Sequence, residues 1–396
     1  MSANGLSGHH RTALLVGLLL GALALRPQIV GVGPLIPRIQ DDLDTSHAVV
    51  GLLGTIPVVC MGIFAPPAAY MASVLGTRRT IGLAILVVGV FGVLRTLVDE
   101  AWLVVVLTWP VGIGMGVAGA LAPVAVKERL GTRPAAGTGA YTTGIQTGAF
   151  VSAAIAVPLA DALGGWRWSL GLMSTVSIVL GVIWFRLVDD VPRPAVRVRP
   201  PRLPWSSPIA WLLVAAFGCM AMSYYGLNAW LADSFVERGW SESSAGWLLA
   251  LSQLSAIPAS FGIPWLSDRV GRRQPFLVGM SSTFLLAVLL IVVVPSGAWA
   301  WALFIGLAQG GMFGLAITLP LDVEERVERV GALLAMQLGL GYTIGATSPF
   351  VLGAIRDATG SFSGSLWAIV GLLVLLVTCV SLLPRARRRE AVAIGG

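Results

Sequence analysis

Residues 266–273, Leu-Ser-Asp-Arg-Val-Gly-Arg-Arg, decide how the rest of the chain is interpreted. This segment is short and charged, and long apolar stretches lie on both sides of it. Residues 70–79, Tyr-Met-Ala-Ser-Val-Leu-Gly-Thr-Arg-Arg, also place a glycine before a basic pair. The two glycines, Gly76 and Gly271, are 195 residues apart. The pair of segments predicts an internal repeat with one basic turn in each half of the chain.

The composition around these turns is strongly apolar. Of the 396 residues, 56% are hydrophobic and 11% are charged, whereas a soluble domain carries about 25% charged residues. A soluble enzyme, a nucleic-acid-binding protein and a disordered tail are therefore excluded, although the pI is near 10. The three cysteines are far apart and are interpreted as apolar core residues. We expect no metal site and no cofactor.

Twelve windows of the sequence are long and apolar enough to cross a bilayer as helices, which takes roughly 20 residues each. They are residues 12–36, 47–70, 80–98, 102–126, 137–161, 168–188, 208–232, 244–266, 275–294, 299–321, 331–354 and 364–384. Strands are not expected, because the windows are long and lack strict alternation. The sequence therefore predicts an all-α membrane protein with twelve transmembrane helices in two pseudo-symmetric six-helix bundles.

The positive charges give this topology an orientation. If both termini are cytoplasmic, the cytoplasmic loops hold 20 of the 26 Lys and Arg residues. The positive-inside rule then predicts a multi-pass protein of the inner cell membrane with cytoplasmic N- and C-termini. The basic cluster at 385–389 is interpreted as topogenic charge on the tail, not as a nucleic-acid site.

The longest interruption between spans is the Pro/Arg-rich stretch 189–207. It is interpreted as a cytoplasmic linker between an N-terminal six-helix bundle, residues 1–188, and a C-terminal bundle with a short basic tail, residues 208–396. Parallel halves of this kind imply alternating access around a central cavity.

At this point the chain resembles the major facilitator superfamily, whose signature between helices eight and nine looks like residues 266–273. In the first-half copy, Ser73 and Val74 stand where the family has Asp and Arg, so a cytoplasmic latch is expected in the second half. The resemblance implies a cytoplasmic gating motif that comprises Gly76, Arg78, Arg79, Asp268, Arg269, Gly271, Arg272 and Arg273.

The first spans are similar to the cyanate/nitroimidazole (CynX/NimT) branch of that family. The residues that carry this resemblance are Leu25-Arg26-Pro27, Val32-Gly33-Pro34-Leu35-Ile36-Pro37, Gly51-Leu52-Leu53-Gly54-Thr55-Ile56-Pro57 and Leu94-Arg95. The resemblance implies secondary active or facilitative transport of a cyanate-like, carboxylate-like or nitroimidazole-like molecule across the plasma membrane by rocker-switch alternating access. The alternative is a multidrug or metabolite efflux transporter of the same superfamily, although the Gly-Pro motif of drug exporters is absent from span five.

Arg26 lies about 14 residues into the first predicted span, near mid-bilayer. A guanidinium there is costly unless it faces protein or water, and intramembrane charge is functional by default. No acidic residue lies in the middle of a span, which favours an anionic substrate as its partner. The alternative is a structural arginine bonded to backbone carbonyls, one of which Pro27 frees.

Other polar residues near mid-depth are candidates for the same site, because sites of this architecture lie near the midplane between the two repeats. For each single residue, a helix–helix hydrogen bond is as plausible as contact with the substrate. The candidates are Gln146, Tyr224, Asn228, Gln253, Gln309, Gln337 and Tyr342, with Tyr225 and Thr343 beside them and Tyr141 as a weaker one.

Two further expectations concern charge near the outer ends of the spans. Arg95 is expected to snorkel to the membrane interface. The histidines all lie at or beyond span ends, and Asp233 is at a helix terminus, so no mid-membrane carboxylate relay is predicted. A pH gradient is accordingly expected to act at most through ionisation of the substrate.

A membrane enzyme or receptor is the third class that we consider, and no nucleophile–base pair, metal cluster or soluble domain supports it. The expected partners are a small anionic or nitro-bearing substrate and the lipid bilayer. We expect a monomer that binds no nucleic acid.

Overall fold

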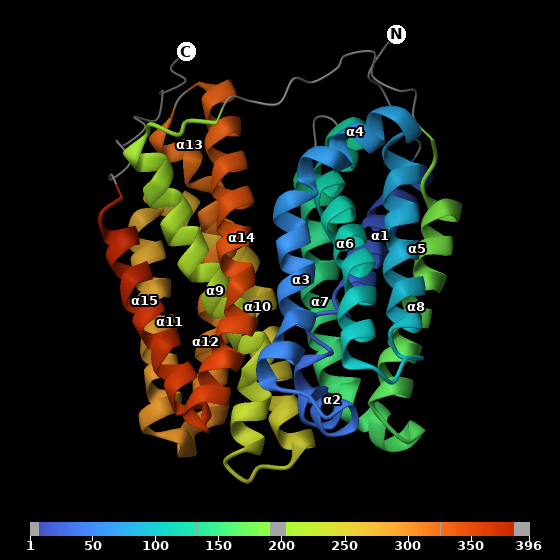
Figure 1. Cartoon of the computed structure of the whole chain (residues 1–396). Coiled ribbons are helices and arrows are strands. Elements are labelled where there is room, and N and C mark those ends of the chain that lie inside the picture. The colour runs from blue at the N-terminus through green and yellow to red at the C-terminus, as the bar shows by residue number, and fades with distance from the viewer. Residues whose placement is uncertain (1–7, 131–133, 191–202, 325, 384–396) are drawn as a thin grey trace, which may run out of the picture.

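The computed structural model describes residues 8–130, 134–190, 203–324 and 326–383. Within these residues the chain is helical and contains no strand. Figure 1 shows α1–α8 gathered on one side and α9–α15 on the other, as two bundles of upright helices. The basic cluster at 385–389 and the middle of the predicted linker, residues 191–202, lie outside the described residues.

The helices follow the order of the predicted spans. The first bundle consists of α1 (Gly8–Leu25), η1 (Gly33–Leu35), α2 (Ile36–Leu43), α3 (His47–Ile63), α4 (Ala65–Leu75), α5 (Thr77–Leu94), α6 (Ala101–Leu130), α7 (Pro134–Leu163) and α8 (Trp166–Leu187). The second consists of α9 (Pro208–Val236), α10 (Glu242–Val270), α11 (Gln274–Val293), η2 (Pro295–Gly297), α12 (Ala298–Thr318), α13 (Pro320–Val323), α14 (Val327–Thr359) and α15 (Phe362–Ser381).

The described helices account for the predicted spans. Ten of them are long and apolar enough to cross a membrane, and α3 with α4, bent by 67°, makes an eleventh. The twelfth is the shorter apolar helix α1, which continues through η1 into α2. The all-α membrane fold with twelve spans in two bundles is therefore confirmed, although the first two spans are broken or bent.

The break in the first span follows from its sequence. α1 ends at Leu25, directly before Arg26 and Pro27. A residue before proline is disfavoured in the α region, and proline cannot donate a backbone hydrogen bond. The chain then turns, with the amides of Ile29 and Val30 both donating to the carbonyl of Arg26. The mid-span arginine thus lies at a helix end in a non-helical segment, 26–32, as in transporters whose discontinuous helices form the binding site.

The two basic turns of the predicted repeat both place a glycine at positive φ. Gly76, between α4 and α5, has φ +88°, and Gly271, between α10 and α11, has φ +69°. L side chains rarely adopt these angles, whereas glycine adopts them freely. Both turns therefore need glycine at the equivalent position to reverse the chain before the basic pair.

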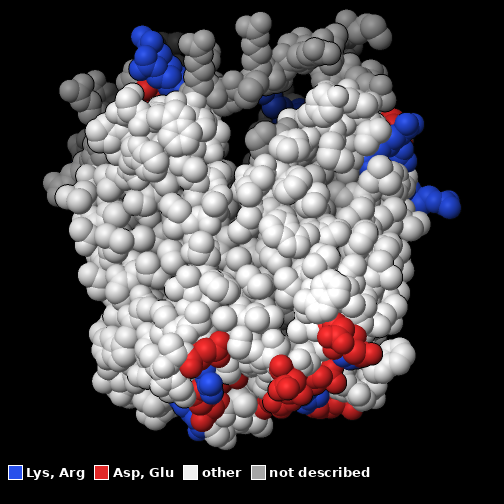
Figure 2. All heavy atoms as spheres, in the orientation of Figure 1, with Lys and Arg blue, Asp and Glu red and all other residues white. Residues whose placement is uncertain are grey.

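The two ends of the molecule differ in charge. We call the end where α1 begins and α15 ends the terminal side, and the opposite end, which carries α2, the distal side (Figure 1). Figure 2 shows basic side chains at the terminal side, a broad uncharged band, and a cluster of acidic side chains at the distal side. This distribution matches the membrane-spanning fold, because an uncharged band is what the hydrocarbon core requires.

Candidate functional site

The two bundles are joined at the distal side by charged side chains. Arg38 on α2 donates Nη2 to Asp161 Oδ1 at the end of α7, 2.6 Å away, and Nε to Glu242 at the start of α10. The two carboxylates compensate the positive charge of this guanidinium at the contact. Arg38 therefore connects the first bundle to the second.

Backbone packing closes the same side. A Cβ on Gly33 would lie 2.3 Å from the carbonyl oxygen of Asn228 on α9. The amide of Phe350 on α14 donates to Thr55 Oγ1 on α3 at 3.2 Å. α3 packs against α14, and α7 packs against α10. The bundles are thus in direct contact at the distal side.

The terminal side is arranged differently. There the described ion pairs join residues of the same bundle: Arg78 and Arg79 with Asp190, Arg273 with Asp268 and Asp322, and Arg329 with Glu324. Figure 2 shows a hollow between the two bundles at this end. The structure is therefore closed at the distal side and open between the bundles at the terminal side.

Arg26 lies between these two ends, in the break of the first span. Its side chain is 8% exposed, and it makes no ion pair among the described residues. Its Nη1 atom is buried and has no hydrogen-bond partner within the part of the chain that the structure describes. A buried charge without a counter-charge is strongly destabilising, so this guanidinium is suited to receive an anion.

Tyrosines from three helices surround Arg26. Tyr224 and Tyr225 on α9, Tyr141 on α7 and Tyr342 on α14 all lie near its guanidinium. The rings of Tyr224 and Tyr225 meet edge to face at 5.0 Å, and those of Tyr225 and Tyr342 are 6.5 Å apart. The chain has five tyrosines, so four of them gather around one buried cation. We call Arg26 together with these four tyrosines the Arg26–tyrosine centre.

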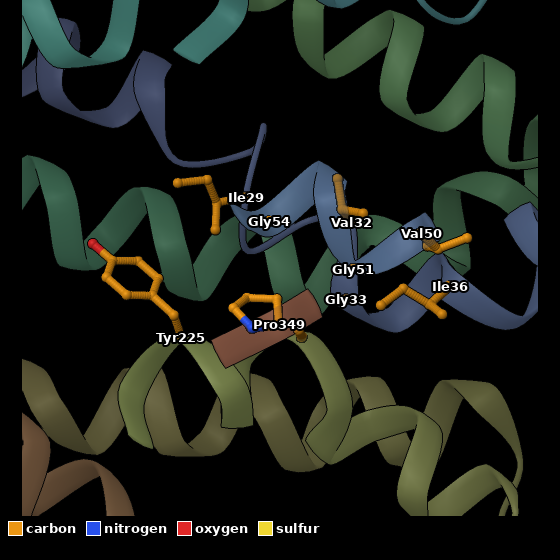
Figure 3. Close-up of a pocket in the computed structure, with 10 residues that line it drawn as sticks. Ile29, Val32, Gly33, Ile36, Val50, Gly51, Gly54, Tyr225 and Pro349 are labelled. Atoms are coloured by element: carbon orange, nitrogen blue, oxygen red, sulfur yellow. The ribbon is translucent and has the colours of Figure 1, made fainter. Parts of the chain in front are cut away.

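A small apolar pocket lies beside this centre, between the bundles (Figure 3). Tyr225 belongs to both. The remaining lining is apolar or glycine and comes from the broken span, α3, α9 and α14, as Ile29, Val32, Gly33, Ile36, Val50, Gly51, Gly54, Ala229 and Pro349. This pocket holds no group that could bind an anion by charge, so we take Arg26 and not the pocket as the candidate site.

The comparison with protein families agrees with this arrangement. The model of the Major Facilitator Superfamily matches residues 13–346. The chain belongs to this superfamily. Like its relatives, it is a membrane transporter and not an enzyme.

Relatives within the superfamily point to a branch. The chain is 27% identical to a 2-nitroimidazole transporter of Escherichia coli, over 94% of this chain and 96% of that protein. It is 28% identical to the cyanate transport protein CynX of the same organism, over 91% and 95%. The resemblance to the cyanate/nitroimidazole branch is therefore confirmed.

A solved structure shares the fold. A bacterial homologue of the human lysosomal transporter Spinster, in an inward-facing and occupied conformation, superposes with a TM-score of 0.76. That alignment covers 95% of this chain and 96% of the other at 17% identity. At that identity the similarity concerns the fold of this superfamily transporter alone.

The other predicted binding residues divide into two groups. Tyr224 and Tyr342 belong to the Arg26–tyrosine centre, and Gln146 is partly buried on α7. Two of the amide side chains form hydrogen bonds between helices, and a third has a buried oxygen for which the described residues offer no partner. Gln253 Nε2 donates to Asn228 Oδ1 at 3.0 Å, Gln337 Nε2 donates to the carbonyl of Ala316 at 2.9 Å, and Gln309 Oε1 is buried without a hydrogen-bond partner.

The residues of the predicted gating motif lie at the terminal side. Asp268 pairs with Arg273 at 2.7 Å, and Arg269 lies over the ring of Trp265 at 3.8 Å. Arg78 and Arg79 share Asp190. While the terminal side is open, these charged residues of the motif thus form their contacts with residues of their own bundle. Arg272 is exposed beside Gly271.

The prediction for Arg95 was wrong. Arg95 does not reach the interface: its side chain is 1% exposed and its Nη2 donates to Gln28 Oε1 at 2.8 Å. Gln28 Nε2 in turn donates to Ser174 Oγ on α8 at 3.0 Å. The position of Arg95 close to the end of its span predicted that its side chain would reach the membrane interface. Instead, Arg95 faces the inside of the bundle, where Gln28 in the broken segment that carries Arg26 accepts its hydrogen bond.

Replacing Gln28 by leucine is expected to lower stability by about 1.5–3 kcal/mol, because a buried guanidinium loses a charged hydrogen bond. The measurement is thermal unfolding of the purified transporter in detergent. The double variant Gln28→Leu with Arg95→Met should recover most of the loss, since it also removes the buried charge. Equal melting temperatures for Gln28→Leu and wild type would contradict the role given to this pair.

Proposed function

We propose that the transporter carries a small monoanion or a nitroheterocycle across the plasma membrane, with Arg26 as the main substrate ligand. The observation that carries this proposal is the buried Nη1 of Arg26, which has no hydrogen-bond partner among the residues that the structure describes. A planar guanidinium binds carboxylate-like or nitro oxygens in pairs. An anion in this position supplies the missing counter-charge.

The tyrosines limit the kind of substrate. Phenol groups donate hydrogen bonds to an anion without adding positive charge. Their ring faces also pack against flat apolar or heterocyclic groups. One guanidinium balances one negative charge, so a dianion would leave a second charge uncompensated at low dielectric. The centre thus favours monoanions and neutral nitroheterocycles, in agreement with the substrates for which the two Escherichia coli relatives are named.

We propose that the terminal side faces the cytoplasm, because it carries the positive loops. On this orientation the protein is open to the cytoplasm. Residues 1–188 and 208–396 are the two halves that rock about the substrate, joined by the linker 189–207, and the gating motif closes the cytoplasmic side in the other half of the cycle. We propose that a single chain performs this cycle.

Counterflow in proteoliposomes tests the substrate class. Vesicles loaded with unlabelled cyanate, formate or 2-nitroimidazole should accumulate the labelled compound transiently, whereas oxalate and tetraphenylphosphonium should not exchange. Protein-free vesicles measure passive permeation of each probe. Exchange of tetraphenylphosphonium without exchange of any monoanion or nitroimidazole would contradict the proposal and favour a multidrug exporter.

A further inference from the structure

Three side chains from different helices meet at the distal contact between the bundles. His47 begins α3, Asp357 lies near the end of α14, and Asp233 lies near the end of α9. His47 Nδ1 is 2.8 Å from Asp357 Oδ1, and His47 Nε2 is 3.7 Å from Asp233 Oδ2. The imidazole ring is also held between Trp230 and Phe362, with ring centres 5.6 and 5.5 Å away. The histidine of one bundle is thus enclosed by the other.

The hydrogen bonds of Asp357 define the proton on Nδ1. Asp357 accepts the backbone amides of His47 and Ala48, at 3.2 and 2.9 Å, and so caps the first turn of α3 from the other bundle. A carboxylate that accepts these bonds at a helix N-terminus is favoured in its charged form. His47 Nδ1 must then carry a hydrogen and donate it to Asp357.

This assignment leaves one proton to be placed. A neutral imidazole with hydrogen on Nδ1 has a lone pair on Nε2, and Nε2 faces Asp233 Oδ2. Asp233 is 7% exposed, and no described residue forms a hydrogen bond with its Oδ2. An ionised carboxylate buried against a lone pair is strongly unfavourable. Either His47 is an imidazolium or Asp233 is a carboxylic acid, and in both cases the pair holds one additional proton.

The charged groups around His47 and Asp233 do not remove the requirement for an additional proton. The charged groups that act on His47 from the packed elements are Arg356 and Asp357 on α14 and Glu237 after α9. Asp233 is also acted on by Asp41 on α2 and Glu242 on α10. Arg356 is the only cation in this set of groups, and it already forms an ion pair with Glu237 at 3.2 Å. The neighbourhood is therefore net acidic and favours the bound proton.

We propose that His47 and Asp233 form a proton-binding site that is occupied while the distal side is closed. When the bundles separate there, α3 leaves α9 and α14, Asp233 gains water, and the proton passes to the distal solution. Closure binds the proton again between Nε2 and Oδ2. Acid on the distal side thus favours the closed state, and the transport cycle depends on distal pH independently of the substrate's charge.

This site was not evident from the sequence, where His47 and Asp233 are span-end residues on different helices. The proposed site lies at span ends and not at mid-membrane. The proposal differs from the prediction that pH acts only through ionisation of the substrate, because it adds a direct effect of pH on the distal contact.

The test measures distal opening by thiol labelling at several pH values. Cys60, Cys219 and Cys379, all buried, are replaced by alanine, and Ala229→Cys places a thiol in the apolar pocket between the bundles. A membrane-impermeant maleimide is applied from the distal side between pH 5 and 8. Rates are divided by those of a Ser296→Cys reference, whose position is exposed in η2, to remove the pH dependence of the thiol. The normalised rate should rise with pH, approaching about tenfold per pH unit.

Two variants separate the proton site from the contact itself. The double variant His47→Gln with Asp233→Asn should label at a rate that no longer depends on pH. Arg38→Gln breaks the neighbouring contact to Glu242 but keeps both His47 and Asp233, so it should label faster at every pH and still depend on pH. If the double variant fails to fold, Asp233→Asn alone is judged by the same loss of slope. A flat wild-type profile, or an unchanged slope in the His47/Asp233 variant, would overturn the proposal.

Discussion

Replacing Arg26 by alanine should weaken binding of monoanionic substrates by about 1.5–3 kcal/mol, or roughly 10- to 150-fold in Kd. Hydrogen bonds to a charged group in a dry site have this magnitude, and in the wild type the substrate replaces a missing partner of Nη1. The measurement is calorimetric titration of purified transporter with formate and cyanate. Unchanged Kd values for every transported anion would contradict the role assigned to Arg26.

Two variants make this result specific. Arg26→Lys keeps the charge but loses the planar fork, so its affinity should fall between those of wild type and Arg26→Ala. Arg167→Ala removes an arginine that pairs with Asp42 and Asp99 at the distal surface, away from the Arg26–tyrosine centre, and should leave Kd unchanged. A loss of affinity in Arg167→Ala as large as that in Arg26→Ala would show a general effect of charge.

A neutral nitroheterocycle provides an internal comparison. It loses a hydrogen bond to Arg26 but no charge–charge attraction, so 2-nitroimidazole should lose about 0.5–1.5 kcal/mol in Arg26→Ala. The ratio of the two losses measures how much of the binding energy comes from substrate charge. Equal losses for formate and 2-nitroimidazole would exclude the monoanion preference.

Local features of the sequence were enough to predict the helical architecture and to single out Arg26 as the main candidate residue. Span lengths depend on runs of apolar residues, and the two basic turns depend on Gly76 and Gly271, whose positive φ angles are properties of single positions. Arg26 could be singled out because a charge at mid-span is costly wherever its helix packs. The fold and the buried cation are thus both set by properties that can be read along one helix.

Contacts between helices could not be read in this way. Arg95 turns inward because Gln28 in the broken segment offers an acceptor, and the break itself is visible only as Pro27 in the sequence. Gln253 Nε2 donates to Asn228 Oδ1 on the neighbouring helix, although each residue looked like a possible ligand. In both cases the partner is on another helix, at a depth and angle that a single span does not specify.

The tyrosines were undervalued for a related reason. Tyr141 and Tyr225 were secondary candidates, yet they lie with Tyr224 and Tyr342 around Arg26. A signal was present, because tyrosine in membrane proteins concentrates at the interfaces and these four lie inside spans. Their gathering at one point still required the packing of α7, α9 and α14 around the broken span.

Substituting Gly51 is expected to prevent closure of the distal side. A Cβ on Gly51 in α3 would lie 2.6 Å from the carbonyl oxygen of Pro349 in α14, across the contact between the bundles. That carbonyl also accepts the indole N–H of Trp230 at 2.8 Å, so it is held in place. The clash exists only while the bundles touch. Overpacking of about 1–3 kcal/mol would therefore favour the distal-open state by roughly 5- to 150-fold.

Gly51→Ala should consequently label faster at Ala229→Cys from the distal side, and its substrate turnover should fall because the carrier rarely closes there. Gly54→Ala is the matched control one turn along α3: its Cβ would meet side-chain atoms of Pro349 at 3.3 Å, a contact that small shifts relieve. Gly262→Ala, with open space around it, controls for the loss of a glycine alone. Wild-type labelling and turnover in Gly51→Ala would mean that α3 and α14 do not separate in the cycle, and alternating access would then require a different pair of moving helices.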